Sequence, residues 1–299
     1  MKKITKHLLR SLVLLGGCIT QSEAACPDFK PDGVCSNSDC AYEDESPFNT
    51  ALKQPLIDAV LNGNVDQVRD LIDRGANPKT QDEQGHTVLM AASSRGFVDV
   101  VGLLLETQRA GVNAQSHNKW TALMYASWSG RIEVVRMLLK ARAEVNAQNY
   151  VGETALIMAA QNGHADVVQA LIDACADVNL QNCCKRTALI AAAFVWACGS
   201  SYKGHIDSVQ ALIEARANVN AQDRDGWTAL ICPSCEGDMD VVNMLLAAGA
   251  NPALESAAKN TAIAYARRNG HEDVVHLFKI AEEWENCPPG PRKLIAEYC

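Results

Sequence analysis

Apolar residues along the chain fall into short segments that recur with a nearly constant period. After Asp166, for example, Val167, Val168 and Leu171 have the i, i+1, i+4 spacing of one buried helical face. A second apolar segment in each period begins with a phrase close to Thr-Ala-Leu-Met/Ile-x-Ala. The steps between its Thr residues are 34, 33, 33, 41 and 33 residues, at Thr87, Thr121, Thr154, Thr187, Thr228 and Thr261. A period near 33 indicates a solenoid of repeated supersecondary units.

Each period predicts a helix, a turn, a second helix and a polar loop. The Thr hydroxyl can accept a bond from an unpaired amide of the first helical turn, so it caps the first helix. A glycine then ends that helix in a left-handed conformation, and an acidic residue three positions later favours the start of the second helix. The glycines are Gly63, Gly96, Gly130, Gly163, Gly204, Gly237 and Gly270, and the acidic residues are Asp66, Asp99, Glu133, Asp166, Asp207, Asp240 and Asp273.

The repeated phrase resembles the ankyrin-repeat motif Thr-Pro-Leu-His-x-Ala, with Ala or Val in place of Pro and Met, Ile or Ala in place of His. The resemblance covers residues 51 to 283. It implies an all-α ankyrin-repeat solenoid of about seven helix pairs with polar hairpin-like loops. Arg142, Cys175 and Arg216 stand where the family often has Gly after the second helix, so we expect left-handed conformations there at a cost of roughly 1 kcal/mol each.

The first residues predict export of a bacterial type. Four basic residues precede the apolar run 12–17, and Ser22-Glu-Ala24 is a small-x-small cleavage site, which is the order of a secretory signal peptide. Leu15-Gly-Gly-Cys18 also resembles a lipobox, in which Cys18 is acylated and Ile19 directs the protein to the outer membrane. Both interpretations export the chain to the periplasm or beyond, and a lipid at Cys18 would be its membrane attachment.

These features divide the chain into four parts. We predict a signal peptide at 1–24, a cysteine-containing segment at 25–50, the repeat array at 51–285 and a tail at 286–299. Removal of the signal peptide leaves 23 basic and 34 acidic residues, so the formal net charge changes from −8 to −11. Such a charge excludes nucleic acid as a partner and would steer basic proteins toward the surface.

Eleven of the twelve cysteines follow the signal region. Because stacked repeats place the ends of the array several times roughly 10 Å apart, we expect disulfides within local groups and none between the two ends. The expected bridges are Cys287 to Cys299, one pair among the N-terminal group and up to three pairs among the middle group. The N-terminal group is Cys26, Cys35 and Cys40, and the middle group is Cys175, Cys183, Cys184, Cys198, Cys232 and Cys235.

The segment Cys232-Pro-Ser-Cys235 carries the alternative chemistry, because Cys-x-x-Cys is the spacing of redox dithiols and of half a zinc site. A thioredoxin-like dithiol lies at a helix start, whereas Cys232 is expected four residues into a helix capped by Thr228. Pro233 removes the helical bond to the carbonyl of Ala229, which predicts a locally weakened helix. A structural disulfide, a zinc site and a redox dithiol remain open here.

The 41-residue step contains eight extra residues within Phe194–Lys203. An insertion in a repeat array maps to a loop on one face, which is often the binding face. The alternative is a longer first helix in which Cys198 is bonded to Cys235 of the neighbouring unit. The two interpretations are compatible.

The ankyrin resemblance implies partner contacts at the loop tips, at the residue before each Thr and on the exposed side of the first helices. Trp and Tyr gather at these positions, and both are common interface anchors. The predicted contact residues are His86, Trp120, Trp128, Tyr150, Glu153, Arg186, Phe194, Trp196 and Trp227. Tyr125 and Tyr265, four residues after a Thr, are expected to serve packing.

The chain lacks the common catalytic signatures, such as Gly-x-Ser-x-Gly, His-Glu-x-x-His or a Gly-rich phosphate loop. His164, His205 and His271 follow the turn position, where the ankyrin resemblance implies a structural role. We therefore predict a protein that is not an enzyme and needs no cofactor or metal. The expected function is an exported scaffold that binds another protein through its loop tips and concave helix face, and the alternative is a thiol-redox or metal-binding protein acting through Cys232 and Cys235.

Overall fold

The computed structural model describes residues 47–107, 110–194 and 202–285, all within one unit of the chain, Asp44–Cys299. These residues form fourteen helices in seven consecutive pairs, which we number as units 1 to 7, each with the loop that precedes its first helix. The pairs are α3 (Pro47–Leu61) and α4 (Val65–Asp73), α5 (Val88–Arg95) and α6 (Val98–Glu106), α7 (Ala122–Trp128) and α8 (Ile132–Lys140), α9 (Ala155–Gln161) and α10 (Ala165–Asp173), α11 (Ala188–Ala193) and α12 (Tyr202–Glu214), α13 (Ile231–Glu236) and α14 (Met239–Ala247), and α15 (Ala262–Asn269) and α16 (Glu272–Glu285).

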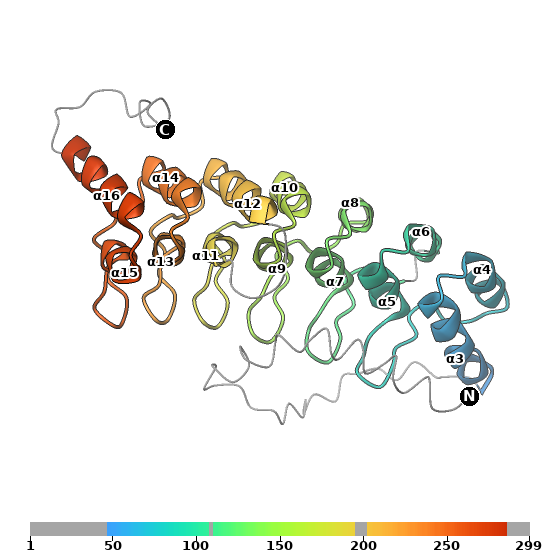
Figure 1. The fold of residues 1–299 in the computed structure, drawn as a ribbon. Coiled ribbons are helices and arrows are strands. Elements are labelled where there is room, and N and C mark those ends of the chain that lie inside the picture. The colour runs from blue at the N-terminus through green and yellow to red at the C-terminus, as the bar shows by residue number, and fades with distance from the viewer. Residues whose placement is uncertain (1–46, 108–109, 195–201, 286–299) are drawn as a thin grey trace. The chain divides into compact units, whose positions relative to one another are not determined.

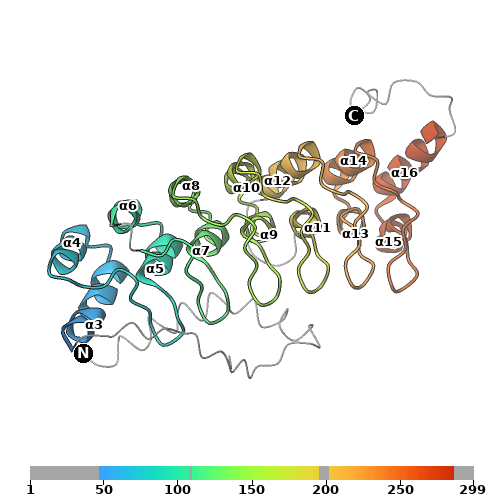
Figure 2. The same ribbon diagram turned by 180° about the vertical axis from the view of Figure 1, so that it is seen from behind.

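The helices form two layers, one of first helices and one of second helices (Figure 1). In the second layer each helix from α4 to α16 packs against the next, and in the first layer α5, α7, α9 and α11 pack in the same way. The view from behind shows the loops extending from the layer of first helices (Figure 2). The predicted all-helical solenoid of seven pairs is confirmed for the described residues.

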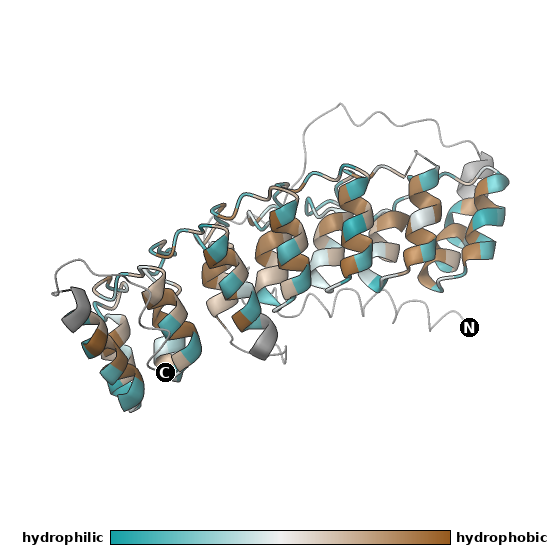
Figure 3. Cartoon of the chain, turned by 90° about the horizontal axis from the view of Figure 1, so that it is seen from above, coloured by the Kyte–Doolittle hydropathy of each residue, from teal (hydrophilic) through white to brown (hydrophobic). Residues whose placement is uncertain are grey.

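The core is a series of thin apolar layers between these helices. The Leu two residues after the Thr is buried in units 2 to 6, at Leu89, Leu123, Leu156, Leu189 and Leu230. The second helices contribute consecutive valines such as Val134 and Val135. Seen from the side of the second helices, hydrophobic and hydrophilic residues alternate along them (Figure 3). Among the helices that the structure describes, none combines the length and the hydrophobicity that a membrane crossing needs.

The predicted Thr caps are confirmed in five of the six units that carry the phrase. Each of these Thr side chains accepts a hydrogen bond of 3.2 to 3.4 Å from the backbone amide three residues later. The five residues are Thr87, Thr121, Thr154, Thr187 and Thr261. The repeated Thr is therefore explained by helix initiation alone.

Unit 6 is the exception, and the prediction that Thr228 caps its first helix is wrong. Helix α13 begins only at Ile231, after a turn in which the Ile231 amide bonds to the Thr228 carbonyl at 3.2 Å. Pro233 then lies third in the helix, where an amide would have no intrahelical partner, so its missing N–H costs no hydrogen bond. The helix begins after Ala229, so the bond to the Ala229 carbonyl whose loss predicted a weakened helix is not part of α13.

The turns after the helices follow the expected pattern with one correction. Arg142, Cys175 and Arg216 have φ values of 64°, 62° and 61°, which confirms the left-handed conformations predicted from the sequence. Gly204, however, does not end a helix, because it lies inside α12. The insertion accordingly lengthens the second helix of unit 5, and the expectation of a longer first helix is wrong: α11 ends at Ala193.

A histidine after the turn position contacts a backbone carbonyl in three units. The ring nitrogens of His164, His205 and His271 lie 3.1, 3.1 and 3.0 Å from the carbonyl oxygens of Trp128, Ala192 and Cys235. Burial lowers the pKa of His164 and of His205. His164 and His271 therefore support the contact with the preceding unit, whereas His205 joins the two helices of unit 5. All three have the structural role that the resemblance implies.

A pair of glycines with the same backbone conformation tests this support. Gly237 and Gly270 both have φ of +81°, but a Cβ on Gly237 would lie 2.5 Å from Nδ1 of His271, whereas nothing lies within 4 Å of a Cβ on Gly270. We expect Gly237→Ala to lower the free energy of unfolding by about 2 kcal/mol, since it adds the displacement of His271 to the backbone strain. Gly270→Ala, which adds strain alone, is expected to cost about 1 kcal/mol. Urea denaturation measures both, and equal losses would contradict a supporting role for His271.

Candidate functional site

Backbone hydrogen bonds join the loop tips of successive units into a continuous ladder. In each step, a backbone amide of one unit donates a hydrogen bond to a backbone carbonyl of the preceding unit. The amide belongs to the residue four positions before the repeated Thr of its own unit. The carbonyl belongs to the residue three positions before the repeated Thr of the preceding unit. The five bonds measure 2.8 to 3.3 Å and run from His117 to Gln84, Tyr150 to Asn118, Cys183 to Val151, Arg224 to Cys184 and Ala257 to Asp225. The ladder fixes the tips of units 2 to 7 side by side, so their side chains form one surface.

Asparagine side chains repeat the connection at the base of the loops. The side-chain oxygen of an Asn accepts the backbone amide of the next unit at 2.7 to 2.9 Å in four consecutive steps. The four acceptors are Asn113, Asn146, Asn179 and Asn220. The polar loops are therefore ordered by bonds between units as well as within them.

A polar side chain also folds four of the six tips internally. Asp82, Asn149, Asn182 and Asp223 each accept the backbone amides of the residues two and four positions later. Burial alone would raise the pKa of Asp82, but hydrogen bonds from the side chain and backbone of His86 lower it below its ordinary value. The tips therefore present their side chains from a rigid backbone.

Four of the rings near the start of the array form one group, which we call the first aromatic cluster: His86, Trp120, Tyr125 and Trp128. The ring centre of Tyr125 lies 4.8 Å from that of Trp120 and 5.6 Å from that of His86. The centre of Trp128 lies 6.3 Å from that of Trp120. Burial, with a contribution from the charge of Asp82, raises the pKa of Tyr125. The contacts of Tyr125 with the rings of Trp120 and His86 agree with the packing role expected from its position.

The predicted contact residues differ in how much of each side chain is exposed. Trp120 is only 9% exposed, and Glu153 is equally buried because its carboxylate accepts a bond from the Asn149 side chain at 3.3 Å. The expectation that both side chains offer themselves to a partner is therefore corrected. His86 and Trp128 are half-buried, and each leaves part of its ring at the surface.

Among the predicted contact residues that the structure describes, Tyr150 has the most accessible ring. It is 45% exposed at the tip of unit 4, and Nζ of Lys119 lies 5.1 Å from its ring centre. A cation above an aromatic face is an attractive contact. The two side chains belong to successive units, so the pair extends the exposed surface along the ladder.

A second aromatic cluster consists of Phe194, Trp227 and Tyr265, with Arg186 beside it. The ring centre of Trp227 lies 5.7 Å from that of Phe194 and 5.4 Å from that of Tyr265. The guanidinium carbon of Arg186 lies 4.8 Å from the ring centre of Phe194. Tyr265, like Tyr125, contributes to a cluster from a position that the sequence assigned to packing.

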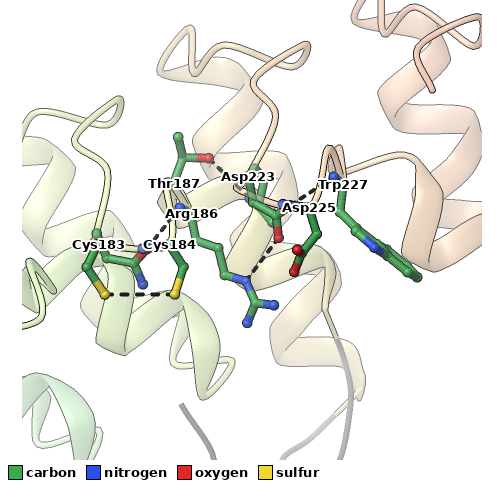
Figure 4. A network of polar contacts seen from close by, with 9 residues as sticks. Cys183, Cys184, Arg186, Thr187, Asp223, Asp225 and Trp227 are labelled. Carbon is green, nitrogen blue, oxygen red and sulfur yellow. Dashed lines mark hydrogen bonds and ion pairs between the residues drawn. The ribbon is translucent and has the colours of Figure 1, made fainter. Parts of the chain in front are cut away.

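Arg186 also crosses from unit 5 to unit 6. Its Nε lies 3.3 Å from Oδ2 of Asp223, whose side chain is 2% exposed (Figure 4). The first helices α11 and α13 pack on each other less extensively than the other neighbouring first helices. The ion pair and the contact between Phe194 and Trp227 therefore add to the connection that α12, α14 and the tip ladder make between these units.

The described cysteines correct part of the disulfide prediction. Cys175, Cys232 and Cys235 form no disulfide, so the expected bond between Cys198 and Cys235 is wrong. Sγ of Cys232 lies 3.7 Å from the Glu236 carboxylate, whereas Sγ of Cys235 accepts a bond of 3.2 Å from Asn269 of the next unit, so the two sulfurs face different neighbours. Cys183 is disulfide-bonded, and its Sγ lies 3.8 Å from that of Cys184.

The chemistry of Cys232 does not favour a reactive thiol. Although α13 begins late enough to place Cys232 in its first turn, the side chain is buried. Burial, with the nearby Glu236 carboxylate, raises the pKa of Cys232, and burial also raises the pKa of Glu236. A thiol with a raised pKa is a poor nucleophile and a poor metal ligand. Within the described ranges, no three His, Cys, Asp or Glu side chains gather closely enough to hold a metal ion.

Several predicted residues lie outside the described ranges. They are Cys18 with the signal region, Trp196 and Cys198 in the insertion, and Cys26, Cys35, Cys40, Cys287 and Cys299 in the terminal segments. The disulfide, lipid and contact roles predicted for them stay predictions.

Paired helices in two layers, joined by a ladder of loop tips, define a helical-repeat solenoid. A family model described as ankyrin repeats in three copies matches residues 56–149 and 194–283, and a second, described as ankyrin repeats in many copies, matches residues 129–172. The chain therefore belongs to the ankyrin-repeat family. Ankyrin repeats are generally protein-interaction scaffolds without enzymatic activity, and the surface described above suits such a scaffold.

Similar curated proteins share only part of the array. A segment of 89 residues is 42% identical to the platypus (Ornithorhynchus anatinus) ankyrin repeat, SAM and basic leucine zipper domain-containing protein 1, and 84 residues are 37% identical to the human photoreceptor ankyrin repeat protein. These matches cover 28% and 27% of this chain and 19% of each relative. A segment of 90 residues is 29% identical to the Dictyostelium discoideum 26S proteasome non-ATPase regulatory subunit 10, covering 30% of this chain and 39% of that protein. The chain thus spans about a fifth of the first two relatives.

Proposed function

We propose that this protein is an exported scaffold that binds one partner protein through its loop tips and the two aromatic clusters. The observation that supports the proposal is the tip ladder, which holds the tip that carries the exposed ring of Tyr150 in a row with the neighbouring tips. The half-buried rings of Trp128 and Trp227, in the two clusters, add further contact residues. A rigid surface loses little conformational entropy on binding, and exposed Trp and Tyr side chains are the commonest interface anchors.

Export is the second part of the proposal. It is supported by the basic residues, apolar run and cleavage site within residues 1–24, and by a lipobox-like alternative that ends at Cys18. Expression of the full chain in a Gram-negative host, followed by cell fractionation and mass spectrometry of the mature N-terminus, tests it. A mature chain that begins at Ala25 or at acylated Cys18 supports export, and a chain that keeps residues 1–24 in the cytoplasm contradicts it.

Binding is tested at the accessible aromatic residues. We expect the double variant Tyr150→Ala, Trp128→Ala to lose at least about tenfold in partner recovery, because each truncation removes a contact ring from the surface while leaving the buried core in place. Recovery is measured by quantitative mass spectrometry after capture from an envelope extract on immobilised protein. Trp120 and Trp227 are unsuitable for this test because each of their rings contacts two other rings of its cluster, whereas that of Trp128 contacts the Trp120 ring alone among the described residues.

Val98 provides the matched control. It is 40% exposed, close to the 45% of Tyr150, but it lies at the start of the second helix α6. Val98→Ala is expected to leave partner recovery unchanged. An equal loss in both variants, or undiminished recovery with the double variant when its circular dichroism matches that of the wild type, would count against the named surface.

A further inference from the structure

The tips of units 3 to 6 carry exposed cations on a protein that is acidic as a whole. Lys119, Lys185 and Arg224 are exposed on three of these tips, and Tyr150 is exposed on the fourth. We call these four residues the cationic ridge. Within the part of the chain that the structure describes, no carboxylate lies within ion-pair distance of the three basic side chains.

The ridge is continuous because the tip ladder passes through it. The Tyr150 amide donates to the Asn118 carbonyl, and the Arg224 amide donates to the Cys184 carbonyl, each beside a ridge lysine. The guanidinium Nη2 of Arg224 also donates to the Cys183 carbonyl at 2.9 Å, which directs this side chain toward the tip of unit 5. Nζ of Lys119 lies over the ring of Tyr150, so this side chain is directed toward the tip of unit 4. The charges are therefore held in a row.

The rest of the protein is predominantly acidic. The formal net charge is −8, and the second helices begin with acidic residues in their first turns, at Asp66, Asp99, Glu133, Asp166 and Asp240. The tip of unit 2, next to the ridge, carries Asp82 and Glu83. Among the ladder residues of units 3 to 6, Asp225 is the single acidic one. The three exposed cations of the ridge therefore contrast with the negative net charge of the chain.

The ridge lysines do not serve the stability of their turns. Lys119 and Lys185 both have φ of 59°, a left-handed conformation that costs a lysine roughly 1 kcal/mol more than a glycine. Units 2, 4 and 6 carry glycine at the equivalent position, as Gly85, Gly152 and Gly226. Strain of this kind is retained where the side chain has another use.

We infer that the cationic ridge binds an acidic, extended segment of the partner protein, with carboxylates opposite the three cations and an apolar or aromatic side chain against Tyr150. The inference rests on the proposed function and adds the chemistry of the partner. Three inter-unit steps of roughly 10 Å separate the tips of units 3 and 6. About nine residues of extended chain, at about 3.3 Å each, cover that distance.

A defined peptide tests the inference without knowledge of the natural partner. The probe is a fluorescein-labelled peptide of about twelve residues in which Glu alternates with Gly around a central Phe, long enough to span the ridge. Its counterpart has Lys in place of each Glu. Fluorescence anisotropy with the full chain is expected to show saturable binding of the acidic peptide, tighter than that of the basic one, and weaker as salt is raised.

Charge reversal at matched sites locates the binding. The ridge variant is Lys119→Glu, Lys185→Glu, Arg224→Glu, and the control is Arg69→Glu, Arg136→Glu, Lys140→Glu, which changes the net charge equally on exposed positions of second helices. We expect the ridge variant to raise the Kd for the acidic peptide at least about tenfold and the control to change it less than about twofold. Equal losses in both variants, no saturable binding, or preference for the basic peptide would overturn the inference.

Two further measurements complete the test. The first distinguishes binding of an acidic protein segment from binding of phosphate-bearing ligands, and the second distinguishes the role of the ridge from that of the aromatic surface. Vesicles of phosphatidylglycerol and duplex DNA present phosphate anions, and tighter ridge-dependent binding of either one than of the acidic peptide would overturn the assignment to a protein segment. If the partner captured by wild-type protein is lost with Tyr150→Ala, Trp128→Ala but is fully retained by the ridge variant, the ridge inference fails while the proposed scaffold function stands. Loss of the partner with the ridge variant and its retention by the control support the inference.

Discussion

The Leu138→Ala variant is expected to lose about 3 kcal/mol of unfolding free energy, within the range of roughly 2 to 5 kcal/mol for buried Leu-to-Ala changes. Leu138 is fully buried in α8, in the middle of the array, where Val134 and Val135 of the same helix are also buried. Because the apolar layers between units are thin, neighbouring side chains have little freedom to fill the cavity. Urea denaturation followed by circular dichroism measures the loss.

Leu139 supplies the control within the same helix. It is the next residue of α8 but is only half-buried, so Leu139→Ala removes the same atoms from a partly solvated position. We expect it to cost less than about 1 kcal/mol. Similar losses for the two variants would mean that helix propensity, rather than burial between units, determines the stability of this layer.

The regular part of the fold can be predicted from the sequence because one interaction repeats in every unit. The cap made by Thr154 and the left-handed turn at Arg142 each depend on residues close in sequence, so the period alone locates them. Unit 6 deviates for a local reason as well, since Pro233 lies within its first helix. The exact start of α13 could not be predicted, because it depends on whether the chain places Pro233 in the first turn.

The candidate site was predicted less completely, because it depends on contacts between units. Position alone marks Trp120 and Glu153 as exposed, whereas the stacking of Trp120 on Tyr125 and the bond from Asn149 to Glu153 bury them. The alternation of Lys119 with glycines at tip positions was visible in the sequence. That the charges form one row follows only from the ladder, which shows that these positions lie side by side.

The Asp223→Ala variant is expected to lose about 3 kcal/mol and to separate the unfolding of units 1 to 5 from that of units 6 and 7. The Asp223 carboxylate accepts the amides of Asp225 and Trp227 through one oxygen and pairs with Arg186 through the other. Hydrogen bonds to a charged group contribute about 1.5 to 3 kcal/mol each when their partner is lost, although such losses are not additive. The carboxylate is buried at the junction where helices α11 and α13 pack little on each other.

Asn149 occupies the equivalent position in unit 4 and provides the comparison. Its side-chain oxygen accepts two tip amides, those of Val151 and Glu153, without an ion pair to a neighbouring unit. Asn149→Ala is therefore expected to cost about 1.5 kcal/mol and to preserve a single unfolding transition. Hydrogen exchange followed by mass spectrometry distinguishes the variants, because repeat arrays unfold in parts when one interface is weakened. If Asp223→Ala and Asn149→Ala lose equal stability and both unfold in one step, Arg186 and Asp223 do not join the two parts of the array.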